Sequence, residues 1–489
     1  MNNGESDDPK AKRLCHRCVG EAYLKAEVQI KGTPDTCSYC GRRGRTYGLD
    51  EIAERIDSIF KEHFIRTSNE PSGWQYSLLS DKESDYSWER DGEQTVYAIM
   101  NAADLPEEAA TDVQQILCEQ YADFDSAAMQ EETEYDADAH YEEKGTDDRT
   151  WQEEWHSFER SLKTEARFFS RTAIAHLASV FDGIETMTAR DGRRLVVDCG
   201  PGTALSAVYR ARVFQSDEKL TEALRWPDIH LGPPPAQLAM AGRMNARGIS
   251  VFYGANDPLV ALAEVRPPVG CDVAVARFDL TRSLRLLDLT ALKDVHITGS
   301  IFDAAFGRAL ERAMFLRSLS SRMTRPVMPD DEALDFVVTQ AVADFLATES
   351  ECVLDGIIYP SAQTAGDASN VVLFHKAARV EPIDLPAGTQ VEASTGHSTE
   401  EGWETDYSVT EITPIVSKSP VSVESLPGIF PIPGSSESYE RYIQSIDDRH
   451  AALRIVLESI DVHSVSKVQY STQTSRVSRH RMESRETEF

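Results

Sequence analysis

The chain has 489 residues, of which 41% are hydrophobic and 27% charged, which is ordinary for a folded protein and argues against wholesale disorder. This length allows roughly two to four domains. The formal net charge of −31 argues against non-specific nucleic-acid binding by the whole molecule, because phosphates would be repelled. No apolar run reaches the roughly 20 residues of a membrane span, and the first residues lack the basic start and apolar core of a signal peptide. We therefore expect a cytoplasmic protein without membrane contact.

Two Cys-x2-Cys pairs follow a polar tail at residues 1–12 that is expected to be disordered. Eighteen residues separate the pairs, which are Cys15, Cys18, Cys37 and Cys40. This spacing is typical of four thiolates around one tetrahedral Zn²⁺, and a cytosolic setting disfavours disulfides. We predict a zinc module over residues 13–48; the alternative is two unrelated cysteine pairs. A closed set of four thiolates leaves no open coordination position, so the predicted role of the zinc is structural.

Three arginines close this module, at positions 42, 43 and 45. They have two possible partners, a nucleic acid or the acidic residues of this same chain. The strongly acidic composition favours the second, so we do not expect nucleic acid to be a partner.

Residues 49–190 are predicted to form a helical domain. Residues 49–64 carry apolar side chains at helical spacing, and further helices are expected from Val96 to about 130 and from Trp151 to Met187. Within the last of these, an inward stripe is expected from Trp155, Phe158, Leu162, Phe169 and Leu177. Residues 131–150 are expected to form an acidic connector. Because residues 101–160 hold 19 Asp or Glu against 3 Lys or Arg, this region is predicted to be a solvated face.

From about residue 191 to residue 382, short β-branched runs alternate with helices, which indicates an α+β domain. The most informative segment is 242–266. It opens with a Gly-Arg turn, continues as a strand ending at Tyr253, and turns again at Asn256-Asp257-Pro258. Asp257 is suited to cap the following helix, and Pro258 fits its first turn. This scaffold could place Glu264 beside a ligand. Residues 383–489 are expected to be a partly disordered C-terminal extension.

Three polar residues stand in surroundings that recur in a known family. Arg210 lies in Ala204-Leu-Ser-Ala-Val-Tyr-Arg-Ala-Arg212, Glu264 lies on the predicted capped helix, and Ser361 ends Asp355-Gly-Ile-Ile-Tyr-Pro-Ser361. In this order they resemble the RES domain, which is named for an Arg, a Glu and a Ser. The resemblance covers about residues 200–380 and implies a compact mixed β core with flanking helices, similar to ADP-ribosyltransferases. The expected fold class is thus α+β, with a zinc module and a helical domain before the RES domain.

The resemblance implies that NAD is the substrate and that its nicotinamide–ribose bond is cleaved. Glu264 would stabilise the cationic ribose. Arg210 and Arg243 would grip the diphosphate, because guanidinium groups offer bidentate contacts. Tyr253 would pack on nicotinamide, and Ser361 would orient the substrate. The sequence has no Gly-x-Gly-x-x-Gly after a first strand, which disfavours hydride transfer in a Rossmann fold.

Known RES domains are toxins that degrade NAD by phosphorolysis or hydrolysis and are held silent by a helix-turn-helix antitoxin. The resemblance therefore implies a toxin or defence effector with phosphate or water as acceptor, and an antitoxin or regulatory protein as partner. The long N-terminal half could instead serve as sensor or built-in inhibitor. One alternative is an ADP-ribosyltransferase acting on a protein or nucleic acid. Another is a catalytically inactive binding module that works through its N-terminal half.

The N-terminal half also resembles the HEPN/RES N-terminal domain. HEPN ribonucleases carry Arg-x4–6-His on a helix, and Arg171-Thr-Ala-Ile-Ala-His176 fits that pattern. A structural Arg and His on a helix is the alternative for so short a motif, and it is the one we favour.

Overall fold

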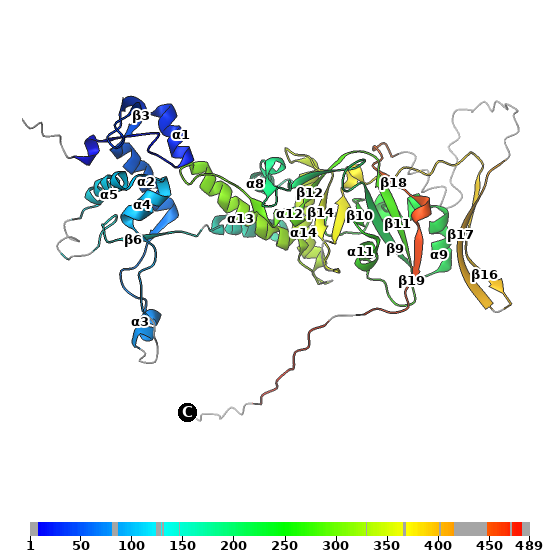
Figure 1. Ribbon diagram of the computed structural model, residues 1–489. Helices are drawn as coiled ribbons and strands as arrows, with labels where there is room; N and C mark the ends of the chain where they lie inside the picture. Colours follow the sequence, from blue (N-terminus) through cyan, green and yellow to red (C-terminus); the bar gives the residue numbers. More distant parts are fainter. Residues whose placement is uncertain are drawn as a thin grey trace, which may run out of the picture. The chain divides into compact units, whose positions relative to one another are not determined.

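The computed structural model describes residues 8–80, 87–123, 129, 132–145, 147–328, 330–364, 368–400, 402–414, 447–469 and 472–481 (Figure 1). The chain divides into two compact units. The first comprises Met1–Ser157 with Val295–Leu319, and the second comprises Phe158–Asp294 with Ser320–Phe489. The division therefore does not follow the boundary expected near residue 190.

The first unit combines short strands with helices. Its elements in chain order are η1 (Pro9–Ala11), β1 (Arg13–Cys15), α1 (Ala22–Lys31), β2 (Thr33–Thr36), β3 (Arg43–Gly48), α2 (Leu49–His63), β4 (Phe64–Arg66), α3 (Gly73–Ser80), β5 (Glu93–Gln94), α4 (Thr95–Ala103), α5 (Glu107–Gln120), β6 (His140–Glu143) and β13 (Val295–His296). Two helices have residues in both units, α7 (Arg149–Thr164) and α13 (Ala304–Thr324). β1, β3 and β2 form an antiparallel sheet.

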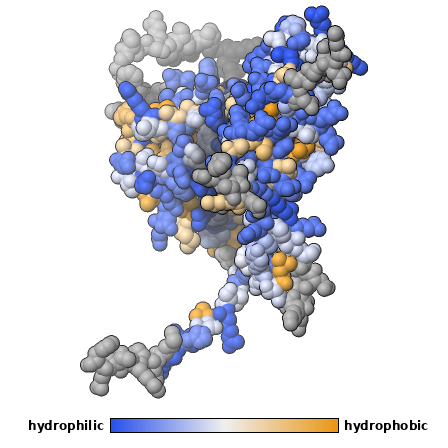
Figure 2. Space-filling view, turned by 90° about the vertical axis from the view of Figure 1, so that its left-hand side faces the viewer, coloured by the Kyte–Doolittle hydropathy of each residue, from blue (hydrophilic) through white to orange (hydrophobic). Residues whose placement is uncertain are grey.

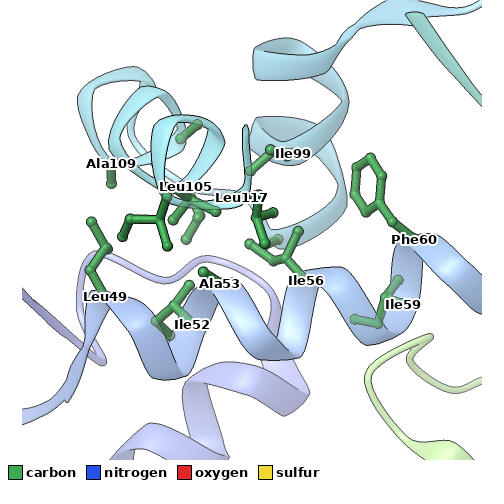
Figure 3. Close-up of a cluster of buried hydrophobic side chains, with 14 of the residues drawn as sticks. Leu49, Ile52, Ala53, Ile56, Ile59, Phe60, Ile99, Leu105, Ala109 and Leu117 are labelled. Atoms are coloured by element: carbon green, nitrogen blue, oxygen red, sulfur yellow. The ribbon is translucent and has the colours of Figure 1, made fainter. Parts of the chain in front are cut away.

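Helix α2 organises the core of the first unit, as its apolar spacing predicts. The backbone N–H of Gly48 donates to Glu51 Oε2 at 2.8 Å, which satisfies a donor at the helix start. Leu49, Ile52 and Ile56 are fully buried in the core that α2 shares with α4 and α5 (Figure 3). The local sequence thus determines both the extent of α2 and the face that it buries.

The acidic connector is more ordered than its composition indicates. Tyr135 and Tyr141 are buried in the same core, and residues 140–143 form β6 between β4 and β5. The Tyr135 hydroxyl donates to Asp57 at 2.9 Å, and Arg90 makes a two-pronged ion pair with Glu132. These aromatic and paired side chains fold a segment that net charge alone marks as a solvated face.

The second unit is built on a nine-stranded mixed sheet in the order β18-β11-β9-β10-β15-β14-β12-β8, with β19 also paired to β11. The strands are β8 (Val196–Cys199), β9 (Ala207–Phe214), β10 (Phe252–Ala255), β11 (Asp272–Leu280), β12 (Leu284–Asp288), β14 (Gly356–Pro360), β15 (Ser369–Leu373), β18 (Leu453–Ile455) and β19 (Asp461–Ser464). β12 and β14 are parallel, and the other neighbours are antiparallel. Two strands of the C-terminal extension therefore complete the sheet.

Helices, short strands and a hairpin surround this sheet. They are α8 (Arg171–Phe181), η2 (Ile184–Thr186), β7 (Thr188–Ala189), α9 (Asp217–Arg225), α10 (Pro227–His230), η3 (Ala236–Leu238), α11 (Pro258–Glu264), α12 (Leu289–Leu292), α14 (Glu332–Thr348), η4 (His375–Ala377), β16 (Gln390–Thr399), β17 (Gly402–Ile412) and η5 (Leu457–Ser459). α11 packs over β9, β10 and β11 (Figure 1). The predicted α+β class, with a four-cysteine cluster before a mixed sheet, is confirmed.

The sheet has two differently packed faces. One buries Val208, Phe252 and Phe278 in the larger core. The other buries Ala211, Ala255 and Val275 beneath α11. This alternation follows from the two-residue period of a strand, and it determines the face on which each polar side chain of β9 emerges.

The surface in view in Figure 2 is mostly hydrophilic, with hydrophobic side chains scattered over it. Within the described part of the chain, no helix is long and apolar enough to cross a membrane.

Candidate active site and metal centre

An opening in the large sheet forms a cavity. β10 pairs with β15 over four residues, whereas its pairing with β9 consists of Ala255 opposite Tyr209. Between the two strands and α11 lies a cavity of about 250 Å³. Its lining comprises Tyr209, Arg210, Ala211, Tyr253, Gly254, Ala261, Glu264, Val265, Tyr359 and Asn370. The predicted site residues Arg210, Tyr253 and Glu264 therefore meet at one cavity.

Glu264 is the last residue of α11, and its carboxylate is held firmly. The helix begins as predicted: Asp257 accepts from the Leu259 N–H at 2.8 Å, and Pro258 occupies the first turn. Ser361 Oγ donates to Glu264 Oε1 at 2.5 Å, and Asn370 Nδ2 donates to the same oxygen at 2.9 Å. In the part of the chain that the structure covers, Oε2 has no hydrogen-bond or ion-pair partner. One oxygen is thus positioned by the protein while the other is available to a ligand.

Arg210 approaches the cavity from the other face of the sheet. Its side chain lies on the face of β9 opposite to those of Tyr209 and Ala211, because side chains alternate along a strand. Its guanidinium lies 5.0 Å from the ring centroid of Phe252. Nη1 donates to the Tyr253 carbonyl at 3.2 Å. Burial, together with the Arg212 cation, lowers the pKa of Arg210 to about 10, so the group stays charged at neutral pH. Arg210 and Glu264 share the cavity, but no hydrogen bond or ion pair joins them among the residues described.

Tyr253 positions the Gly-Arg turn that carries Arg243. Its hydroxyl accepts from the Met244 N–H at 3.0 Å and donates to Asn245 Oδ1 at 2.9 Å. Asn245 Nδ2 in turn donates to the carbonyls of Met240, Ala246 and Ile249, which closes the loop. Burial raises the pKa of Tyr253 to about 12, so the hydroxyl keeps its proton for this network. The polar partner expected for Tyr253 is therefore the protein itself.

Arg243 lies beside the cavity without lining it. Its Nη1 donates to the Met323 carbonyl at 3.1 Å, and the guanidinium lies 5.1 Å from the centroid of Phe336. Burial lowers the pKa of Arg243, while Tyr359, Tyr253 and Glu264 are close enough to counter the shift. Arg243 thus stands close enough to Glu264 for their charges to interact, and among the described residues the hydrogen bonds of its guanidinium use Nη1 alone.

The sequence reasoning missed three residues of this site. Asn370 is 4% exposed and binds the carboxylate of Glu264. Asn245 organises the turn, and Tyr359 contributes to the cavity wall. The sequence does hold a signal for Asn370, which is a polar residue near the start of the largely apolar strand Ser369-Asn-Val-Val-Leu. Buried polar side chains need hydrogen-bond partners, so this asparagine marked a polar contact.

The four cysteines converge as the sequence predicts. Their sulfur atoms lie within 4.8 Å of one another, with Cys15 to Cys40 at 3.6 Å and both Cys15 to Cys18 and Cys18 to Cys37 at 3.8 Å. A tetrahedral ion with bonds of about 2.3 Å to sulfur separates its ligands by about 3.8 Å. The backbone N–H of Arg42 lowers the pKa of the Cys40 thiol to about 7, whereas burial raises the pKa of the Cys15 and Cys18 thiols, so the assignment rests on the positions of the sulfur atoms. The cluster fits one metal ion.

The arginines of this module do not pair with acidic groups as expected. Arg45 donates to the Gly32 carbonyl at 2.7 Å. Arg42 and Arg43 are exposed, and within the described ranges neither forms an ion pair. The interpretation of these side chains as internal partners of the acidic segments therefore stays a prediction.

The Arg171–His176 pair lies on α8. Arg171 is exposed at the first helical position. The ring of His176 packs against Phe158, with ring centroids 5.5 Å apart. This contact agrees with a structural histidine, the alternative that we favoured, and the ribonuclease role stays a prediction.

A family model matches part of this chain. Residues 207–393 match the model of the RES domain family, and the matched segment includes Arg210, Glu264, Ser361 and Asn370. The chain has no significant match among curated proteins and none among solved structures. The matched segment is therefore similar to RES domains, which are linked in general to NAD-related enzymatic roles.

Proposed function

We propose that the RES domain cleaves the nicotinamide–ribose bond of NAD as a glycohydrolase or phosphorylase and acts as a toxin or defence effector. The observation that carries this proposal is the hydrogen bonding of the Glu264 carboxylate. Two neutral donors fix Oε1, and Oε2 has no partner among the described residues. A carboxylate held in this way beside a cavity is preorganised to stabilise a positive charge that develops on a bound ligand.

The reaction matches the residue types. When the bond breaks, its electron pair moves to the pyridine nitrogen, nicotinamide leaves as a neutral base, and the ribose becomes cationic at its anomeric carbon. Glu264 stabilises that cation. Arg210 and Arg243 supply the positive charge that a diphosphate needs, and the ring of Tyr253 lines the cavity where the nicotinamide would pack. Ser361 keeps Glu264 in place and can also meet the substrate.

The acceptor then bonds to the anomeric carbon. With water, the product is ADP-ribose, and a proton is released. With inorganic phosphate, the product is ADP-ribose phosphorylated at the anomeric carbon. The same cation could instead be captured by a protein or nucleic acid, as in an ADP-ribosyltransferase.

For the four-cysteine cluster we propose a structural Zn²⁺. Three sulfur–sulfur distances of 3.6–3.8 Å match a tetrahedral zinc site, and four thiolates saturate the ion. Such a centre stabilises the fold of its module and takes no part in the chemistry of NAD.

Incubating the full chain with NAD, with and without phosphate, tests the enzymatic proposal. Mass spectrometry separates the outcomes: free nicotinamide with ADP-ribose, nicotinamide with its phosphorylated counterpart, or ADP-ribose added to a macromolecule. NAD that remains intact in all samples, with folded and metal-loaded protein, would overturn the proposal. The Glu264→Gln variant serves as the control for a contaminating hydrolase.

A further inference from the structure

The charge of this protein is sharply segregated along the chain. Residues 13–48, here called the four-cysteine module, contain seven Lys or Arg against three Asp or Glu, a net charge of +4. The following stretch, residues 49–157, contains seven Lys or Arg against thirty Asp or Glu, a net charge of −23. A positive module within a chain of net charge −31 needs a physical explanation.

Three arginines stand directly at the cysteine cluster. Arg17 stands two residues after Cys15, and Arg42 stands two residues after Cys40. The sulfur atoms of these two cysteines are 3.6 Å apart. Arg17 and Arg42 therefore lie next in the chain to neighbouring ligands of one candidate metal site, and Arg43 follows at the start of β3. All three side chains are exposed.

Among the residues that the structure describes, no acidic group pairs with these three cations. Other basic residues of this region are engaged, since Arg13 lies 3.4 Å from Asp35 and Lys12 binds Asp112 at 2.7 Å. By contrast, the structure gives Arg17, Arg42 and Arg43 no ion pair within the residues it describes. The acidic end of α5 approaches the module around Tyr39 and Lys12, where Asp112 is already paired.

A metal would lower this positive charge without cancelling it. A Zn²⁺ ion with four thiolates carries about −2, because four negative sulfurs outnumber its two positive charges. The loaded module would keep a net charge of about +2, and Arg17, Arg42 and Arg43 are exposed on it. Guanidinium groups on a rigid knuckle match phosphate oxygens in geometry as well as in charge.

We propose that the four-cysteine module binds the phosphate backbone of a nucleic acid through Arg17, Arg42 and Arg43. The contacts are made to phosphates, so the surface binds without reading a base sequence. Salt screens the repulsion from acidic groups that lie farther away than a Debye length of about 10 Å, so a positive patch on an acidic chain can still bind a polyanion. The three arginines belong to the first unit and the residues that line the cavity belong to the second, and the test of this proposal does not depend on the proposed reaction.

Fluorescence anisotropy on the full metal-loaded chain tests this proposal. The probes are labelled 20-nucleotide RNA, single-stranded DNA and duplex DNA, each measured from 50 to 200 mM salt. Against single strands, the triple variant Arg17→Ala, Arg42→Ala, Arg43→Ala should bind at least about tenfold more weakly and lower the salt slope by about 2. Zinc content and NAD consumption should stay unchanged.

A matched control removes three arginines elsewhere, at positions 476, 479 and 481 of the exposed C-terminal segment. If the module binds, this control keeps the affinity of the natural chain. The proposal is overturned if the natural chain binds none of the three probes or if the variant at positions 17, 42 and 43 binds as tightly as the natural chain. It is also overturned if only the variant at positions 476, 479 and 481 loses binding. The three probes distinguish RNA from DNA and single strands from duplexes.

Discussion

The two candidate sites of this protein are assembled over very different lengths of chain. The four cysteines lie within 26 residues, on two turns next to the paired strands β1, β2 and β3. The cavity around Glu264 draws on residues from 209 to 370 and needs a sheet, a capped helix and a loop to form. A local site depends on spacing and on the metal, whereas a distributed site depends on the packing of a whole domain. The two should therefore fail in different ways.

The largest effect is expected from Cys37→Ser in the full chain. A buried ligand is lost, and since binding of a structural zinc is worth about 10–16 kcal/mol, the module should lose its metal and its fold. Elemental analysis should fall from about one zinc per chain to none, and residues 13–48 should lose protection from hydrogen exchange.

Cys118→Ser is the matched control, because Cys118 lies in the first unit outside the cluster. NAD consumption should survive both substitutions, since every residue lining the cavity belongs to the second unit. A Cys37→Ser chain that keeps its zinc would show that these sulfurs are not the ligands.

Glu264→Gln probes the distributed site. The substitution keeps shape and removes charge, so turnover of NAD should fall by about 10² to 10³ while NAD affinity stays largely intact. Steady-state kinetics and calorimetric titration measure the two quantities. Turnover at the natural rate would remove Glu264 from the mechanism and favour a binding module.

Arg210→Met should differ in kind from Glu264→Gln. The diphosphate is charged in the ground state and in the transition state, so both affinity and turnover should drop, by about tenfold or more. Burial depresses the pKa of Arg210, meaning that the folded protein disfavours its charge. The substitution also removes the hydrogen bond to the Tyr253 carbonyl, so Tm is measured beside the kinetics, and a large fall in Tm would assign Arg210 a structural role. Arg212→Met, on the same strand, is the control.

Asn370 is expected to act by positioning Glu264. Asn370→Ala removes one of the two donors to Oε1 and should lower kcat about tenfold with little change in KM. Asn370→Asp is nearly isosteric but places a second carboxylate against the first, so it should cost more than the alanine substitution. Equal losses in the two variants would indicate that Asn370 only fills space.

The smallest effect concerns the helix that carries Glu264. Asp257→Ala removes a side-chain cap from α11 and should lower stability by about 1 kcal/mol, measured by chemical unfolding. Asp331 precedes α14 without capping it through its side chain, so Asp331→Ala should cost less. Equal costs for the two would mean that the cap does not set the position of α11.

Patterns that act over a few residues were readable from the sequence alone. The cysteine spacing predicted the cluster, the apolar period predicted α2, and Asp257-Pro258 predicted the start of α11. The sequence segments around Arg210, Glu264 and Ser361 indicated the RES domain, which the family match over residues 207–393 confirms. In each case the cause is local: a thiolate spacing, a helical stripe, a cap.

Only the tertiary structure decided which distant groups meet. Phe169, expected on an inward stripe with Trp155 and Leu162, is almost fully exposed, because the helix breaks before it and the helical period no longer applies. The strands β18 and β19 lie in a segment whose sequence shows little strand periodicity. They form because they pair with β11. Asn370 reaches Glu264 across 106 positions of sequence, and no local pattern carries that information. Long-range pairing and burial therefore assembled the site whose residue types the sequence had supplied.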